Sequence, residues 1–140
     1  MRKFLVFFRK CVLIFIILAA GLPSLEAQAA GVVGNGTPES CTEAALIAAL
    51  AGGGTVTFNC GGPTTIFITT PKVIAADTTI IGDDVITLAG EGSTRLFEVN
   101  SGVTLRLQHI VLDGGASTDS DGGAIASAGA LYLELSLIHI

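Results

Sequence analysis

Hydrophobic residues alternate with polar or threonine neighbours in five segments beyond residue 54. A period of two residues is typical of a β-strand that buries one of its faces. Clusters rich in Gly, Asn and Asp separate these segments and indicate turns. The sequence therefore predicts a chain built mainly of short strands, whose alternating apolar pairs are Val56 and Phe58, Ile66 and Ile68, Ile86 and Leu88, Leu105 and Leu107, and Leu131 and Leu133.

The spacing of the strands leaves no room for crossover helices, because a new strand-like segment begins every 6 to 14 residues. A sandwich or barrel of antiparallel hairpins fits this spacing. A coarse internal repeat favours a solenoid instead. Residues 100–107 resemble residues 127–134 at an offset of 27, and Val85 stands 18 positions before the similar Val103. We expect a loose period of roughly 20 to 27 residues, with two or three short strands in each repeat.

One helix is predicted before the strands. Ser40 and Glu43 form the S-x-x-E pattern of a capping box, directly after Pro38. Apolar residues then recur at helical spacing, and the glycines at 52–54 end the pattern. The residues that recur are Ala44, Ile47, Ala48 and Ala51, with Leu46 and Leu50 beside them.

The first 29 residues have the pattern of a secretory signal peptide. A basic segment at residues 1–10 precedes an unbroken apolar run at residues 11–20, and Ala27 and Ala29 occupy the two positions that a signal peptidase recognises. A membrane anchor is the alternative, but the apolar run is short for a span that needs about 20 residues. We expect cleavage after Ala29 and export from the cell.

Charge is distributed unevenly along the 140 residues, whose net charge is −5. Only three basic residues follow Ala29, namely Lys72, Arg95 and Arg106, against eleven acidic ones, so this part carries −8. Nucleic-acid binding needs clustered Lys and Arg to neutralise phosphates. We therefore expect no nucleic-acid partner.

Two cysteines, Cys41 and Cys60, remain after removal of the leader. In an oxidising compartment such a pair is expected to form a disulfide. A zinc site is the alternative, but His109 and His139 are remote in sequence and no second pair of cysteines exists. The sequence therefore favours a Cys41–Cys60 disulfide.

The most acidic loop carries Asp113, Asp119 and Asp121. Oxygen-rich loops can hold Ca²⁺, but this ion takes six to eight oxygen ligands and the EF-hand pattern is incomplete here. A solvated external turn is the favoured interpretation. These three carboxylates are the candidate metal ligands, and we expect neither a resident cofactor nor a resident metal.

Several segments together resemble secreted bacterial proteins with a right-handed parallel β-helix. Residues 42–50, followed by 54–58, are similar to the opening of these proteins, in which a helix covers the open end of the solenoid before the first strand. Residues 77–82, 86–90, 95–102 and 107–115 resemble successive coils. The tetrapeptides at 97–100 (FxxN) and 122–125 (GGAI) match repeats of the chlamydial polymorphic outer-membrane proteins. The resemblance covers residues 37 to 135.

The resemblance implies an all-β fold, a right-handed parallel β-helix solenoid with an N-terminal capping helix, in which Cys41–Cys60 fastens the cap to the first coil. It also implies a protein at the outer membrane or outside a bacterium, of the non-catalytic adhesin-like or structural type. The expected partners are glycans or other cell-surface material. Contact with a membrane is expected only through the signal peptide or a C-terminal anchor beyond the given sequence.

Pectate-lyase-like enzymes share this scaffold, so a polysaccharide lyase or hydrolase is the alternative function. Such a lyase needs carboxylates that hold Ca²⁺ against uronate groups and an Arg that removes a proton. Arg106 alternates with Leu105 and Leu107 and is expected to point outward, with only Asp84 and Asp113 as acidic candidates near it. We therefore name no catalytic residue and lean against an enzyme.

The segment 134–140 resembles the translated sequencing-adapter tail of truncated reading frames, and we leave it, with His139, out of the functional argument. A solenoid also needs a second cap, which these residues do not provide. We expect an N-terminal piece of a longer solenoid. The expected organisation is a signal peptide at 1–29, an N-terminal region with the capping helix at 30–54, the first coils at 55–133 and the suspect tail at 134–140.

Overall fold

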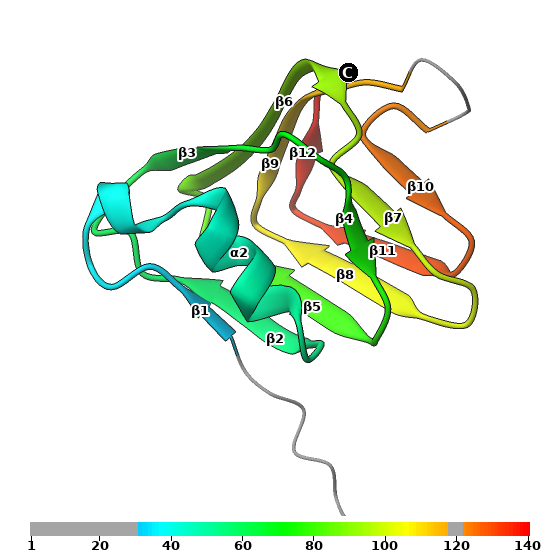
Figure 1. The fold of residues 1–140 in the computed structure, drawn as a ribbon, viewed down its shortest axis with the longest axis horizontal. Coiled ribbons are helices and arrows are strands. Elements are labelled where there is room, and N and C mark those ends of the chain that lie inside the picture. Colours follow the sequence, from blue (N-terminus) through cyan, green and yellow to red (C-terminus); the bar gives the residue numbers. More distant parts are fainter. Residues whose placement is uncertain (1–30, 118–121) are drawn as a thin grey trace, which may run out of the picture.

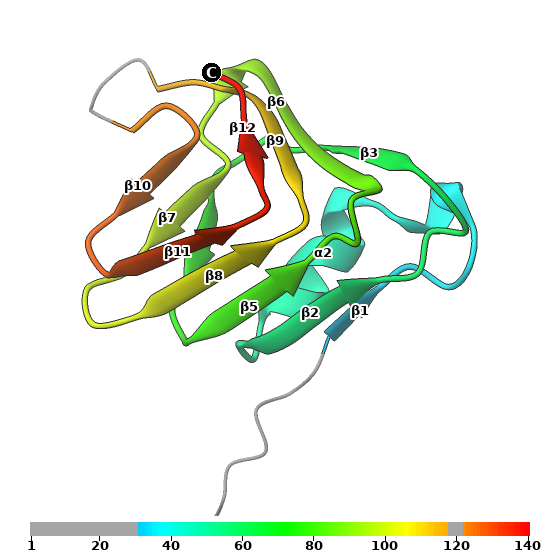
Figure 2. The same ribbon diagram turned by 180° about the vertical axis from the view of Figure 1, so that it is seen from behind.

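The computed structural model describes residues 31–117 and 122–140, and strands predominate in this part of the chain. The strands form three sheets, which Figures 1 and 2 show from opposite sides. Sheet A has the order β1 (Gly31–Val33), β2 (Gly54–Phe58), β5 (Thr78–Ile81), β8 (Thr104–Gln108) and β11 (Ala130–Glu134). Sheet B has the order β3 (Thr64–Phe67), β6 (Ile86–Thr94), β9 (Val111–Gly115) and β12 (Leu137–Ile138), and sheet C the order β4 (Lys72–Ile74), β7 (Phe97–Val99) and β10 (Ile125–Ser127).

Every strand pairing is parallel, and from β2 onward the chain visits sheets A, B and C in turn. In sheet A, Val56 pairs with Ile80, which is 24 positions later. Ile80 pairs with Leu107, 27 positions later, and Leu107 with Leu133, 26 positions later. The antiparallel sandwich or barrel is therefore wrong, and the predicted all-β class with regularly spaced strands is confirmed.

One part of the predicted repeat is wrong. The offset of 18 aligned the segment at Val85 with the segment at Val103, but these segments enter different sheets. Ile86 pairs with Thr64 in sheet B, whereas Thr104 begins β8 of sheet A. The similarity arose because every strand repeats the same alternation, whichever sheet it belongs to.

The core lies between the three sheets. Each of the predicted apolar pairs from β2 to β8 has at least one fully buried member, because alternate side chains of a strand point to the same side. The last pair behaves differently: Leu133 is 48% exposed, although its partner Leu107 is completely buried. The largest fully buried side chains are Phe97, Leu46, Ile66, Ile74, Ile80, Ile86, Leu88, Leu96, Leu105, Leu107, Ile110 and Leu112.

Helix α2 (Glu43–Leu50) follows a short 3-10 turn, η1 (Pro38–Ser40). The predicted capping box is wrong, because the N-cap is Thr42, whose Oγ1 accepts the N–H of Ala45 at 3.2 Å. Ser40 instead stabilises the preceding turn through the carbonyl of Thr37. The helix ends as expected, before the glycines at 52–54.

Two contacts fasten α2 to the strands. The predicted disulfide between Cys41 and Cys60 is confirmed, with 5.7 Å between the Cα atoms, and it joins the chain two residues before α2 to the chain two residues after β2. On the opposite side, Gly31 of β1 packs directly on the helix, because a Cβ atom there would lie 2.5 Å from the carbonyl oxygen of Ala49. The disulfide therefore fixes the beginning of α2, and the contact between Gly31 and Ala49 fixes its last turn.

Residues with positive φ recur where the chain passes from sheet A to sheet B. Asp84 follows β5 with φ 60°, His109 follows β8 with φ 52°, and Leu135 follows β11 with φ 47°. This left-handed conformation is tolerated by Asp and His but is strained for Leu. The sharp corner between the sheets thus recurs once per three strands.

Candidate functional site

The outer face of sheet A presents one side chain from each of four neighbouring strands in a single row. Thr55 pairs with Thr79, Thr79 with Arg106, and Arg106 with Tyr132. Adjacent strands are about 4.8 Å apart, so the row extends across the strands with this spacing. As predicted, Arg106 points outward between the buried Leu105 and Leu107.

Arg106 stacks on the ring of Tyr132, with 4.2 Å between its guanidinium carbon and the ring centroid. Such a cation–π contact holds the guanidinium in place without occupying its N–H groups. Within residues 31–117 and 122–140, Arg106 makes no hydrogen bond or ion pair. Its donors are therefore directed to solvent.

A polar cleft of about 240 Å³ lies beside Arg106. Asp77 stands at this cleft and accepts the backbone N–H of Thr104 through Oδ1 at 2.8 Å. The hydroxyls of Thr55 and Thr79 have no hydrogen-bond partner in the described part of the chain, so they can bind a polar ligand. The full lining is Gly54, Thr55, Asp77, Thr78, Thr79, Thr104 and Arg106.

The other two basic residues of the described chain have carboxylate partners. Lys72 is 5% exposed, and its Nζ lies 2.6 Å from Oε1 of Glu43. Arg95 lies 2.8 Å from Glu98 in sheet C and also donates to the carbonyl of Gly122 and to Ser117. Arg106 is thus distinguished from both by having no carboxylate partner among the described residues.

The Glu43 carboxylate is bound mainly to the segment between β3 and β4. Thr69 donates to it through both its N–H (2.8 Å) and its hydroxyl (2.7 Å), and Thr70 donates its N–H. Burial raises the pKa of Glu43, but the hydrogen bonds from Lys72, Thr69 and Thr70 outweigh this effect and lower the pKa from 4.5 to about 2. Because every partner belongs to the fold itself, this cluster is structural.

His109 also has a partner, since its Nδ1 lies 3.0 Å from Oδ2 of Asp84 at the corner between sheets A and B. The side chain of Asp84 is 70% exposed. Together with the positive φ of both residues, this contact indicates a corner that the two side chains stabilise. His109 thus lies in the short connection between β8 and β9.

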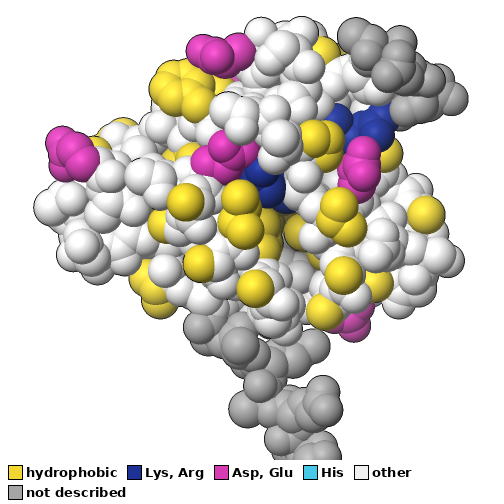
Figure 3. Space-filling model, in the orientation of Figure 1, with side chains coloured by type: hydrophobic (Ala, Val, Ile, Leu, Met, Phe, Trp, Pro, Cys, Tyr) yellow, Lys and Arg dark blue, Asp and Glu magenta, His cyan; other side chains and the backbone are white. Residues whose placement is uncertain are grey.

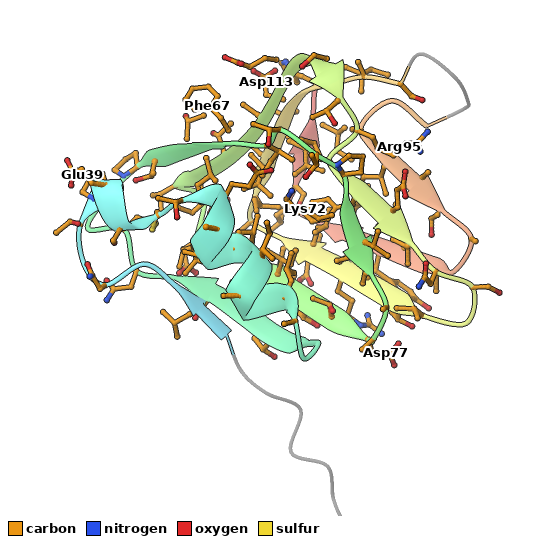
Figure 4. All side chains as sticks on the ribbon, in the orientation of Figure 1. Glu39, Phe67, Lys72, Asp77, Arg95 and Asp113 are labelled. Atoms are coloured by element: carbon orange, nitrogen blue, oxygen red, sulfur yellow. A yellow bond between two sulfur atoms is a disulfide. The ribbon has the colours of Figure 1, made fainter. Side chains whose placement is uncertain are left out.

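The candidate calcium ligands are only partly described. Asp113 is exposed on β9 of sheet B, whereas Asp119 and Asp121 lie outside the described residues. Among residues 31–117 and 122–140, no three His, Cys, Asp or Glu side chains are grouped so that they could hold a metal ion. Figure 4 shows Asp113 at the top of the view and Asp77 at the bottom, so Asp113 lies far from the cleft beside Arg106.

Sequence reasoning found Arg106 but missed Asp77, Thr79 and Tyr132. Their grouping depends on the register of sheet A, which places residues 24 to 27 positions apart side by side. The sequence repeat has an offset of 27 residues, whereas Arg106 and Tyr132 are 26 residues apart. Aligning the two repeats with one residue less would have placed Arg106 opposite Tyr132. The cleft required the three-dimensional structure.

Comparison with protein-family models, curated proteins and solved structures found no match to this chain. Along the described residues, no helix is both long enough and apolar enough to cross a membrane. The predicted signal peptide lies outside these residues.

Proposed function

We propose that the chain is an exported or cell-surface protein with a right-handed parallel β-helix, and that sheet A binds acidic glycans without catalysis. The order of the strands supports the fold. The chain enters the three parallel sheets in rotation, as expected of a solenoid with three strands in each coil. Helix α2 packs against β1 and β2, the first two strands of the chain.

The observation that carries the binding function is the unpaired Arg106. Its guanidinium is held by Tyr132 and has free donors beside a cleft with threonine hydroxyls. Arginine binds carboxylates through two parallel hydrogen bonds, and hydroxyls bind the hydroxyls of sugars. A saccharide that carries a carboxylate therefore fits this site better than a neutral one. This chemistry makes the proposed glycan partner specific enough to test.

The row across sheet A supports a linear ligand. Thr55, Thr79 and Arg106 recur about every 4.8 Å, so a chain that crosses the strands meets one polar side chain per strand. The ligand would then lie perpendicular to the strands. Contact over several coils would raise the affinity, because after the first contact the ligand is already held close to the remaining side chains of the row.

The alternative function, a polysaccharide lyase, has less support. A lyase needs carboxylates that hold Ca²⁺ on the same face as its Arg. Asp113 pairs with Ala89 in sheet B, not with a residue of sheet A. Asp77 does lie at the cleft, but its Oδ1 already accepts a backbone N–H. We therefore propose binding as the function.

The test compares the wild type with Arg106→Gln in calorimetric binding to oligogalacturonate and to a neutral glucan of equal length. We expect measurable binding of the acidic ligand alone, weakened at least about tenfold by Arg106→Gln and retained in part by Arg106→Lys. A matched control is Thr87→Ala on the outer face of sheet B, which should bind like the wild type, whereas Thr79→Ala should bind more weakly.

Equal binding by Arg106→Gln and the wild type would overturn the site, as would the lack of any binding to acidic glycans. The same samples, incubated with polygalacturonate and Ca²⁺, are followed by the absorbance of unsaturated products. The appearance of such products would overturn the non-catalytic part of the proposal and favour the lyase.

A further inference from the structure

The capping helix α2 has an apolar outer face. Ala44, Ile47, Ala48 and Ala51 follow the i, i+3, i+4, i+7 spacing of one helical stripe, and all four are exposed. The opposite side of the helix packs on the core through the fully buried Leu46. The terminal units of repeat proteins normally present a polar outer face to water. This helix is hydrophobic on both sides, which indicates that its outer face is covered by a partner.

A groove of about 570 Å³ separates α2 from β4. Ile47, Leu50 and Ala51 line it from the helix, and Val73, Ala75 and Ala76 line it from β4 and the segment that follows. Ile47 is 49% exposed and Val73 57% exposed. Figure 3 shows hydrophobic side chains gathered over α2 and toward β4.

The backbone of β4 is also open toward this side, because β4 is the terminal strand of sheet C. The N–H of Lys72 donates to Leu96 O and the carbonyl of Ile74 accepts from Asn100, so both residues bond toward β7. In a parallel ladder the residue between them directs its N–H and C=O to the other side. Val73 therefore offers an apolar side chain and an unpaired backbone at the groove.

No free charge lies in this groove. Its single charged side chain, Lys72, is paired with Glu43, and Figure 4 shows Lys72 between α2 and β4. The chain beyond Ala29 carries −8 in total, so most of its surface would repel a second copy. The groove between α2 and β4 adds no unpaired charge to this repulsion.

We propose that this face binds a second copy of the chain in a two-fold symmetric dimer. Ile47 protrudes at the edge of the groove, and the same groove on a second copy could receive this side chain. A two-fold axis near Ala48 would place the Ile47 of each copy in the groove of the other. A patch in which a knob and a hole lie side by side is self-complementary, as such a dimer requires. The alanines at 44, 48 and 51 allow the two helices to approach closely.

The observations favour a second copy over the chain's own leader. The predicted cleavage after Ala29 would leave one residue before Gly31, too little to fill the groove. The dimer is also independent of the proposed glycan site, since Arg106 and Tyr132 lie on the outer face of sheet A. An eight-residue helix is only about 12 Å long, whereas a stable interface buries about 800 Å² per partner. We therefore expect a dimer that dissociates on dilution.

The first experiment measures sedimentation velocity over a range of concentrations, using the exported protein with its N-terminus determined by mass spectrometry. We expect a concentration-dependent dimer that is weakened at least about tenfold by Ile47→Asp. Phe67→Asp is the matched control, because Phe67 is 55% exposed but lies on β3 of sheet B. A monomer at all concentrations overturns the proposal, as does equal dimerisation of Ile47→Asp and the wild type.

The second experiment places a cysteine at the proposed axis. Ala48→Cys should form a covalent dimer under mild oxidation, whereas Ser101→Cys, in the exposed turn between β7 and β8, should not. Circular dichroism verifies that both variants are folded. Equal cross-linking of the two variants overturns the two-fold arrangement. A monomer that retains its leader, and whose leader becomes sensitive to protease in Ile47→Asp, would instead identify the leader as the occupant.

Discussion

The Nζ atom of Lys72 lies 2.6 Å from Oε1 of Glu43, and this pair joins helix α2 to the beginning of β4. Lys72 is almost completely buried, whereas the side chain of Glu43 is 20% exposed. A buried charge without a partner is strongly unfavourable. The two residues therefore depend on each other, and the attachment of the helix depends on both.

Glu43→Ala should destabilise the protein by about 3 kcal/mol, because it leaves the Lys72 ammonium buried without its carboxylate. Glu43→Ala combined with Lys72→Met should recover a large part of this loss. Urea unfolding of the two single variants and the double variant measures the coupling. Additive effects of the two substitutions would show that the pair is not coupled.

The pKa of Glu43 predicts a dependence of stability on pH. Because the folded protein holds this pKa at about 2 instead of 4.5, the carboxylate contributes stability that is fully present above about pH 4.5. This contribution, up to about 3 kcal/mol, is lost as the pH falls toward 2. The free energy of unfolding of Glu43→Gln should therefore fall less steeply than that of the wild type between pH 4.5 and 2. Parallel curves in this range would contradict the prediction.

Loss of the Cys41–Cys60 disulfide should lower the free energy of unfolding by about 3 kcal/mol, since the bond closes a loop of 19 positions in the unfolded chain. Cys41→Ser with Cys60→Ser, measured by thermal unfolding, tests the size of the effect. In exported wild-type protein a thiol reagent should label neither cysteine until a reductant is added. Labelling of both without reduction would show that no disulfide joins these two residues in the exported protein.

Leu107 and Leu133 occupy paired positions in β8 and β11 but should respond differently to truncation. Leu107→Ala should cost about 3 kcal/mol because it opens a cavity in the core. Leu133→Ala should cost less than about 1 kcal/mol, because the side chain is already 48% exposed. Equal losses in chemical denaturation would show that Leu133 is buried in solution.

The sequence predicted the strands that contain a clear alternating pair, because burial of one face imposes this pattern on at least four or five residues. It did not predict β1, β4 or β12, which have at most three residues each and are too short to show a period. The helix was located correctly, but its cap was not. Thr42 and Ser40 are both good N-cap residues, and local preference does not distinguish between them.

The candidate site was less accessible to sequence reasoning. Arg106 could be placed on the outer face because Leu105 and Leu107 surround it, and this is a local property. Its contact with Tyr132 and its lack of a carboxylate partner in the described structure depend on which strands pair and in what register. Likewise, Glu43 fitted a capping box in the sequence, yet its carboxylate binds residues 26 to 29 positions away.

The rotation of the chain through sheets A, B and C makes its length adjustable. One passage through the three sheets is a circuit, and from β2 onward each strand bonds to the strands one circuit before and one circuit after it. If one whole circuit is removed, the circuits on either side of it can therefore pair with each other in the same way. Gln108 of β8 pairs with Ile81 of β5. Deleting residues 81–107 would therefore put Gln108 directly after Ile80, at the position that Ile81 occupies in the intact chain. Evolution can therefore lengthen or shorten such a molecule in steps of about 4.8 Å while it retains the rest of the fold.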